Sequence, residues 1–154
     1  YGIPWYVTSA VTVYNKEIIE KSGISQGNLP KTYFDLGKIA PKIKQKESKF
    51  TIMPTLSENG KMLDYFNKFG IPIINDNQTK ALFNTQESVR VLKFWKEFYN
   101  KRYIPAESLT QHHREALEKF QAEETAFIVA GTNFLKIIKQ CFHQIQTIIK
   151  FNAL

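Results

Sequence analysis

Short runs of β-branched residues alternate with capped helical segments along this chain, and this alternation constrains the fold more than any other feature. Residues 7–14 are rich in β-branched Val and Thr, as in a strand, and Asn15 follows as a typical helix N-cap. Strands that each lead into a helix are typical of α/β proteins. A chain of 154 residues has the length of one domain. We therefore predict a helix-rich α/β fold with short strands.

Periodicity, caps and turn residues give the positions of the expected elements. Asn75-Asp-Asn-Gln78 has the composition of a hairpin turn between two short apolar runs. Pro41 falls within a helix that Thr32 caps, and we expect it to kink or divide that helix. The expected strands are 7–14, 50–53, 71–74, 80–83 and 125–130, and the expected helices are 16–21, 32 onward, 62–69, a long helix capped by Asn84, 113–123 and 133–140.

Composition limits the classes of function. The net charge of +7 is compatible with nucleic-acid binding, but the lysines are spread along the whole chain. Cys141 is the single cysteine, which excludes an internal disulfide and a cysteine-based metal site. No apolar run approaches the ~20 residues of a membrane span. The first residues lack the features of a signal peptide, so either the protein is not exported or its true N-terminus is missing.

Motifs for catalysis are absent from the sequence. It has no glycine-rich phosphate loop, no HExxH and no GxSxG. His112 and His113 are adjacent, and adjacent helical residues point about 100° apart, so they do not easily share a metal ion. Glu58 lies in a polar loop, where it either accepts ligand hydroxyls or neighbours a helix N-cap, and no second carboxylate is placed to face it. We predict no enzyme, no metal site and no cofactor.

Three segments share a pattern that suits ligand binding. Each is a strand that delivers aromatic or small polar residues into a loop, and ligands of open α/β sheets settle at such loops. Flat rings beside hydroxyl, amide and carboxylate groups suit a polyhydroxylated ligand. The apolar face of a sugar stacks on an aromatic ring, and its hydroxyls make directed hydrogen bonds to the polar groups. Each segment alone also has a core or capping explanation. The candidate residues are Trp5, Tyr6, Thr8 and Ser9; Thr55, Ser57 and Glu58; and Thr132, Asn133 and Phe134.

Motifs in a fixed order carry a family resemblance. The segment YGIPWYVTSAVTVYNKEIIEKSGI, followed by LPKTYFDLGKIAPKI, combines G-x-P-W, a strand that ends in Tyr-Asn-Lys, a helix that ends in Ser-Gly, and P-x-T-aromatic-x-x-Leu. ALFNTQESVRVLKFWKEFYNKRYIP and EKFQAEETAFIVAGTNFLKII continue the pattern. The chain resembles the bacterial extracellular solute-binding proteins of carbohydrate ABC importers (family 1, maltose-binding-protein-like). The resemblance covers nearly all of residues 1–140.

The resemblance implies a periplasmic-binding-protein type II fold, in which two α/β lobes close on a sugar. Residues 1–140 would be mainly the second lobe of a truncated protein, with a hinge-crossing strand at 1–14. Trp5, Tyr6, Thr8 and Ser9 then fall at hinge-side contacts and Thr55 to Glu58 at the contact loop of the second lobe. Asn133 stands where the family often has a stacking aromatic, with Phe134 adjacent. The tail 141–154 departs from the family, and it is either a truncated or frameshifted end or a helix extension.

The resemblance therefore implies a substrate-binding component of an ABC importer, which captures a sugar and delivers it to membrane permease subunits. It also implies an extracytoplasmic location, periplasmic or lipid-anchored at the outer face of the cytoplasmic membrane. A lone lobe would expose its hinge strand, so self-association is an expected consequence. The alternative is a basic α/β module that binds an acidic partner or nucleic acid, which a steep salt dependence of binding would favour.

Overall fold

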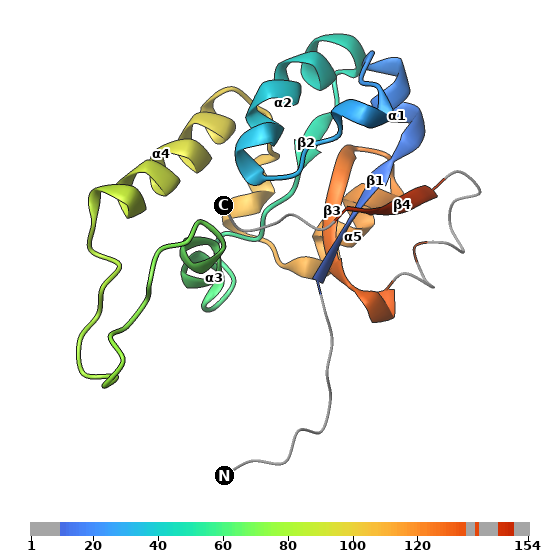
Figure 1. Cartoon of the computed structure of the whole chain (residues 1–154). Coiled ribbons are helices and arrows are strands. Elements are labelled where there is room, and N and C mark those ends of the chain that lie inside the picture. Colours follow the sequence, from blue (N-terminus) through green and yellow to red (C-terminus); the bar gives the residue numbers. More distant parts are fainter. Residues whose placement is uncertain (1–9, 135–137, 139–144, 150–154) are drawn as a thin grey trace.

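One sheet of four strands organises the computed structural model, which describes residues 10–134, 138 and 145–149 (Figure 1). The strands lie in the order β2-β3-β1-β4. β2 pairs in parallel with β3, whereas β1 pairs antiparallel with both β3 and β4. The mixed sheet with its helices confirms the predicted α/β class. The strand bounds are β1 Ala10–Asn15, β2 Phe50–Ile52, β3 Thr125–Gly131 and β4 Ile145–Ile149.

Two helices, α1 and α2, begin at the predicted caps. The Asn15 side chain accepts a hydrogen bond from the backbone N–H of Ile18 at 3.1 Å, and α1 begins there. Thr32 and Asp35 form the capping box of α2, in which each side chain accepts from the other residue's backbone N–H. The α-helices are α1 Lys16–Lys21, α2 Tyr33–Glu47, α3 Lys61–Lys68, α4 Gln86–Asn100 and α5 His113–Gln121, and the 3-10 turns are η1 Gln26–Asn28, η2 Ala106–Leu109 and η3 Thr132–Phe134.

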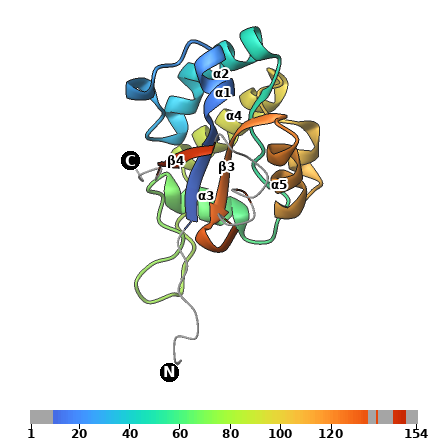
Figure 2. The same cartoon turned by 90° about the vertical axis from the view of Figure 1, so that its right-hand side faces the viewer.

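The two faces of the sheet are covered by different helices. Successive residues of β3 face opposite ways, so Phe127 enters the core that α1 to α4 contribute to, whereas Ile128 enters a smaller core with α5. Phe127 and Phe120, one in each core, are fully buried. Figure 2 shows α5 alongside β3. The arrangement leaves the ends of the strands as the places where loops gather.

Three predicted details differ in the structure. Pro41 does not divide α2, because the buried face of this helix continues past it from Leu36 to Ile43 and packing outweighs the lost backbone hydrogen bond. α4 is capped by Thr85, whose hydroxyl accepts from the backbone N–H of Ser88, and not by Asn84. The hairpin shrinks to one isolated bridge, Ile74 with Ala81, in a loop that projects from the body (Figure 1).

The tail adds a strand to the sheet. β4 pairs with β1, with Thr12 opposite Ile149 and Asn15 opposite Ile145. A helix extension over this segment is therefore wrong. The spacing of its apolar residues resembled a helix, but β-branched residues beside an available strand edge favour pairing.

The first prediction concerns the larger core. We expect Phe127→Ala to lower the free energy of unfolding by about 3–5 kcal/mol, because it leaves a cavity where a fully buried ring packs. Phe34→Ala is the matched control, since this ring is 40% exposed and should cost far less. Urea denaturation of the two variants and the parent chain gives the comparison. Equal losses for the two variants would contradict the assignment of Phe127 to the core.

A second prediction follows from the capping box. The hydrogen bond from Lys38, assisted by those from Thr32 and the backbone N–H groups, lowers the pKa of Asp35 to about 2. The folded pKa lies below the unfolded value of 3.8, so the stabilisation is complete above about pH 4 and is lost as pH falls through about 2. The difference in unfolding free energy between the parent chain and Asp35→Asn should therefore shrink between pH 5 and ~2.

Urea denaturation across this pH range measures that difference. Asp76→Asn, at an exposed loop position outside the capping box, serves as the control for the loss of one carboxylate. A difference for Asp35→Asn that stays constant from pH 6 to ~2.5 would show that the carboxylate contributes nothing through its ionised form.

Candidate functional site

Two of the three predicted contact segments leave the sheet at the same edge. Ile52, the last residue of β2, pairs in parallel with Phe127 of β3, so the loops after both strands leave at the same edge. Ala10, the first residue of β1, pairs with Gly131 and lies at this edge as well. The structure thus brings the loop at 55–58 toward residues 132–134. Trp5, Tyr6, Thr8 and Ser9 lie outside the described residues.

The loop after β2 is held in shape by its own hydrogen bonds. The buried Thr55 hydroxyl donates to Glu58 Oε2 at 2.7 Å, and the Glu58 backbone N–H donates to the Thr55 carbonyl at 3.2 Å. The backbone N–H of Leu56 donates to the carbonyl of Ser108 in η2 at 2.9 Å. Ser57 is exposed at the tip of the turn. Thr55 therefore orients the Glu58 carboxylate and is not itself open to a ligand.

Glu58 keeps hydrogen-bonding capacity. Its side chain is 34% exposed, and Lys61 Nζ lies 4.0 Å from Oε2. Among the described residues, the hydrogen bond from Thr55 and the ion pair with Lys61 both use Oε2. An oriented, partly exposed carboxylate with a second oxygen that neither contact uses suits the acceptance of ligand hydroxyls.

The turn after β3 supplies polar and aromatic groups. Thr132 and Asn133 are exposed in η3, and Phe134 is half-buried against the smaller core. The ring of Phe134 meets the imidazole of His113 edge to face, with centroids 5.1 Å apart. The aromatic group next to Asn133 is thus fixed by packing.

His113 is a site residue that the sequence did not single out. It is the first residue of α5, and its Nε2 is buried without a hydrogen-bond partner among the described residues. Burial lowers the pKa of His113, Glu58 raises it, and Lys61 lowers it further. Both charged groups belong to the contact loop and its following helix. The sequence feature that could have indicated a buried His113 is its position three residues before Ala116, on the buried face of α5.

A small cavity lies beneath this edge. It has a volume of about 20 Å³, room for about one water molecule, and Thr55, Lys61 and His113 line it together with Val129 of β3. Tyr65 also lines it, and burial raises the pKa of its hydroxyl well above the usual value, so this group stays a neutral donor. Lys68 is paired with Asp64 at 2.8 Å. The charges around the cavity are therefore largely balanced.

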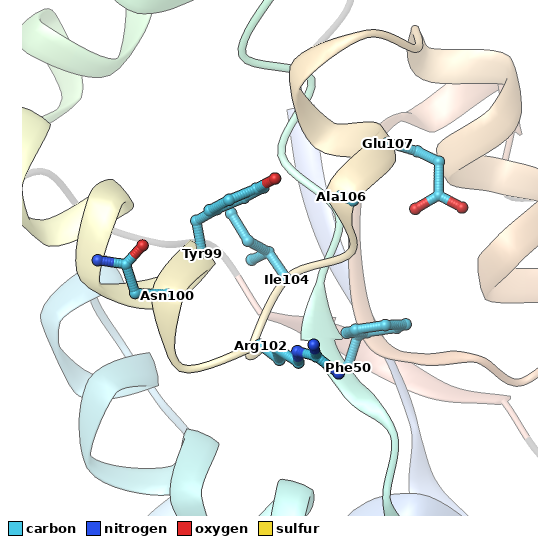
Figure 3. A pocket seen from close by; sticks show the side chains of 7 residues that line it. All are labelled: Phe50, Tyr99, Asn100, Arg102, Ile104, Ala106 and Glu107. Atoms are coloured by element: carbon cyan, nitrogen blue, oxygen red, sulfur yellow. The ribbon is translucent and has the colours of Figure 1, made fainter.

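A larger pocket of about 460 Å³ lies at the opposite end of β2, as Figure 3 shows. Phe50, Tyr99, Arg102 and Glu107 contribute to its wall. The Glu107 carboxylate points away from the other labelled groups in Figure 3, and it is paired with Lys119 at 3.2 Å. None of the predicted contact residues that the structure describes lines this pocket, so the candidate site is the edge of the sheet where β2 and β3 end.

The chemistry of the candidate site is that of binding. It combines a carboxylate, hydroxyl and amide groups and an edge-packed ring, which suit directed hydrogen bonds and stacking. Within the described part of the chain, no group of three His, Cys, Asp or Glu side chains is placed to hold a metal ion. Of the helices described, none is long and apolar enough to cross a membrane.

Solved structures share this fold. A periplasmic-binding protein of Synechococcus sp. MITs9220 matches with a TM-score of 0.85 and 24% identity over 98% of this chain and 38% of its own. A solute-binding protein of Thermotoga lettingae with bound α-D-tagatose matches with a TM-score of 0.80 and 22% identity, over 100% of this chain and 42% of its own. Maltose-bound MalE3 of T. maritima matches with a TM-score of 0.77 and 19% identity, over 99% and 41%.

This chain therefore spans about two fifths of the length of the structures that it matches. At these identities the likeness establishes the periplasmic-binding-protein type II fold. No curated protein sequence matches the chain. One family model matches the chain, and it describes solute-binding proteins, which agrees with the prediction of a binding protein and not of an enzyme. The model of that family matches residues 1–144, and the chain belongs to the bacterial extracellular solute-binding proteins.

Proposed function

We propose that this chain is the second lobe of a protein that binds a sugar or oligosaccharide for an ABC importer. The observation that carries the proposal is the parallel pairing of β2 with β3, which gathers the loop at 55–58 and the turn at 132–134 at one edge. Family membership supports a solute as ligand, and the neighbours with bound tagatose or maltose favour a carbohydrate. Residues 1–140 would form the lobe, with the segment 1–14 crossing the hinge and 141–154 as an added tail.

Each candidate residue has a role suited to a sugar. Glu58 accepts hydrogen bonds from ring hydroxyls, while Ser57, Thr132 and Asn133 offer exposed polar groups at the same edge. Phe134 presents a ring to the apolar face of the sugar. Thr55 holds Glu58 through the 2.7 Å hydrogen bond. Trp5, Tyr6, Thr8 and Ser9 would complete the contacts from the hinge side.

Binding in this proposal shifts an equilibrium between open and closed lobes. The ligand contacts both lobes only in the closed form, so it stabilises that form, which then docks on the permease. Such a protein works outside the cytoplasm, either in a periplasm or anchored at the outer face of the membrane. A lobe without its partner would expose the hinge segment, which favours association between copies.

The test of the function is a thermal-shift panel of sugars, amino acids and metal ions on the full-length protein. A sugar should raise the melting temperature, because a ligand that binds only the folded state stabilises it by mass action. The chain of 154 residues should bind the same sugar much more weakly, since half of the contacts and the enclosure are missing. Stabilisation by amino acids or metal ions alone, with no sugar active, would contradict the carbohydrate assignment.

A mutational prediction tests the site itself. Glu58→Gln should weaken sugar binding by the full-length protein by about 10- to 100-fold, because a hydrogen bond to a charged group contributes about 1.5–3 kcal/mol. The amide oxygen can still accept from Thr55, so the loop should keep its shape. Isothermal titration calorimetry measures the affinity.

Glu97→Gln is the matched control. This carboxylate is 60% exposed on α4 and paired with Lys101, the residue that follows the helix, so the change should leave the affinity within about twofold. If Glu58→Gln also leaves the affinity within about twofold, Glu58 does not contact the ligand, whatever the ligand is.

A further inference from the structure

His113 carries a buried polar atom that the proposed binding contacts do not use. Five side-chain atoms of the described residues are buried without a hydrogen-bond partner, and His113 Nε2 is the only titratable one among them. The other four are the hydroxyls of Thr51, Ser108 and Thr125 and the indole nitrogen of Trp95. Such groups call for an explanation, because an unpaired buried polar atom is costly.

The surroundings of His113 come from several elements. η3 contributes the ring of Phe134, with the two ring centroids 5.1 Å apart. The loop after β2 contributes Thr55, which lines the same cavity as His113 and whose hydroxyl holds the carboxylate of Glu58. α3 contributes Lys61, Tyr65 and Lys68 around the shared cavity, and α2 contributes Tyr33. The neighbouring charged or titratable groups along the chain are His112, which precedes α5, and Arg114 and Glu115 of α5 itself.

These surroundings favour the neutral imidazole. Nε2 is buried, Lys61 repels a positive ring, and the N-terminus of α5 disfavours a cation in its first turn. Glu58 is the one neighbour with the opposite effect on His113, and its carboxylate is held by the Thr55 hydroxyl. The two protonation states of His113 therefore favour different contacts. The neutral ring packs against Phe134, whereas the carboxylate of Glu58 would stabilise a charged ring.

We propose that His113 is a positioning residue of the candidate site. Its neutral ring holds Phe134 in place, and the Glu58 carboxylate then remains available to the ligand. Protonation of His113 displaces both side chains. The expected effect on sugar binding rests on the proposed function, because Phe134 and Glu58 are two of its proposed sugar contacts. The folded state disfavours the proton, so the arrangement is intact above the ordinary histidine pKa of 6.5 and is lost as pH falls through the lower folded pKa. Sugar capture would thus weaken in acid.

The test needs no ligand, so its failure is distinct from a failure of the proposed function. Carbon–proton NMR spectra of the histidine rings of this chain are recorded from about pH 4.5 to 8, a range that spans histidine titration. The His113 signal should titrate with a midpoint below 6.5. The ring signals of Phe134 and the side-chain signals of Glu58 should move with the same midpoint.

Two variants and one control separate positioning from general stability. His113→Phe keeps a flat ring against Phe134, and His113→Gln keeps a polar group, so at least one should fold. Both should abolish the pH-dependent movement of the Phe134 and Glu58 signals. His112→Asn, which retains a good N-cap at the adjacent exposed position, should leave that movement unchanged.

Two results would overturn the proposal. One is a His113 midpoint at or above 6.5, and the other is movement of the Phe134 and Glu58 signals that persists in His113→Phe. Once the panel on the full-length protein has found a sugar, its affinity should be lower at pH ~5 than at ~7.5, and His113→Phe should remove this difference.

Discussion

The parallel pairing of β2 with β3 is the interaction on which the rest of the site depends. The other pairings in the described sheet are antiparallel, so this ladder alone sends two successive strand ends toward one edge. Phe50 pairs with Thr125 and Ile52 with Phe127, and the Phe127 ring anchors the register in the larger core. A slip of one residue would turn Phe127 away from that core and would separate the two loops.

The sequence predicted most of the architecture because its signals are local. Asn15, and Thr32 with Asp35, begin helices for reasons contained within four residues, and Gly23 and Gly70 adopt the positive φ that ends a helix. The predictions that failed depend on packing. Pro41 stays within one helix because the face around it is buried, and the tail forms a strand because β1 has a free edge.

The candidate site was predictable in part for the same reason. Strand-to-loop transitions located Thr55 to Glu58 and Thr132 to Phe134, and strand pairing brings them to one edge. The role of Thr55 was not predictable, since only the structure shows that its hydroxyl donates a hydrogen bond to Glu58. The contact of His113 with Phe134 could not be predicted either, because it joins residues 21 positions apart, and the spacing of His113 to Ala116 indicates burial but not this partner.

The hydrogen bond from Leu56 N–H to the Ser108 carbonyl has a consequence for how such a site can diversify. It anchors the contact loop through main-chain atoms to a segment distant in sequence, and any residue except proline at 56 can make it. The exposed side chain at 57 is therefore free to change without loss of the loop's position. A scaffold of this kind allows new ligand preferences to arise by exchange of side chains alone, with the backbone inherited unchanged.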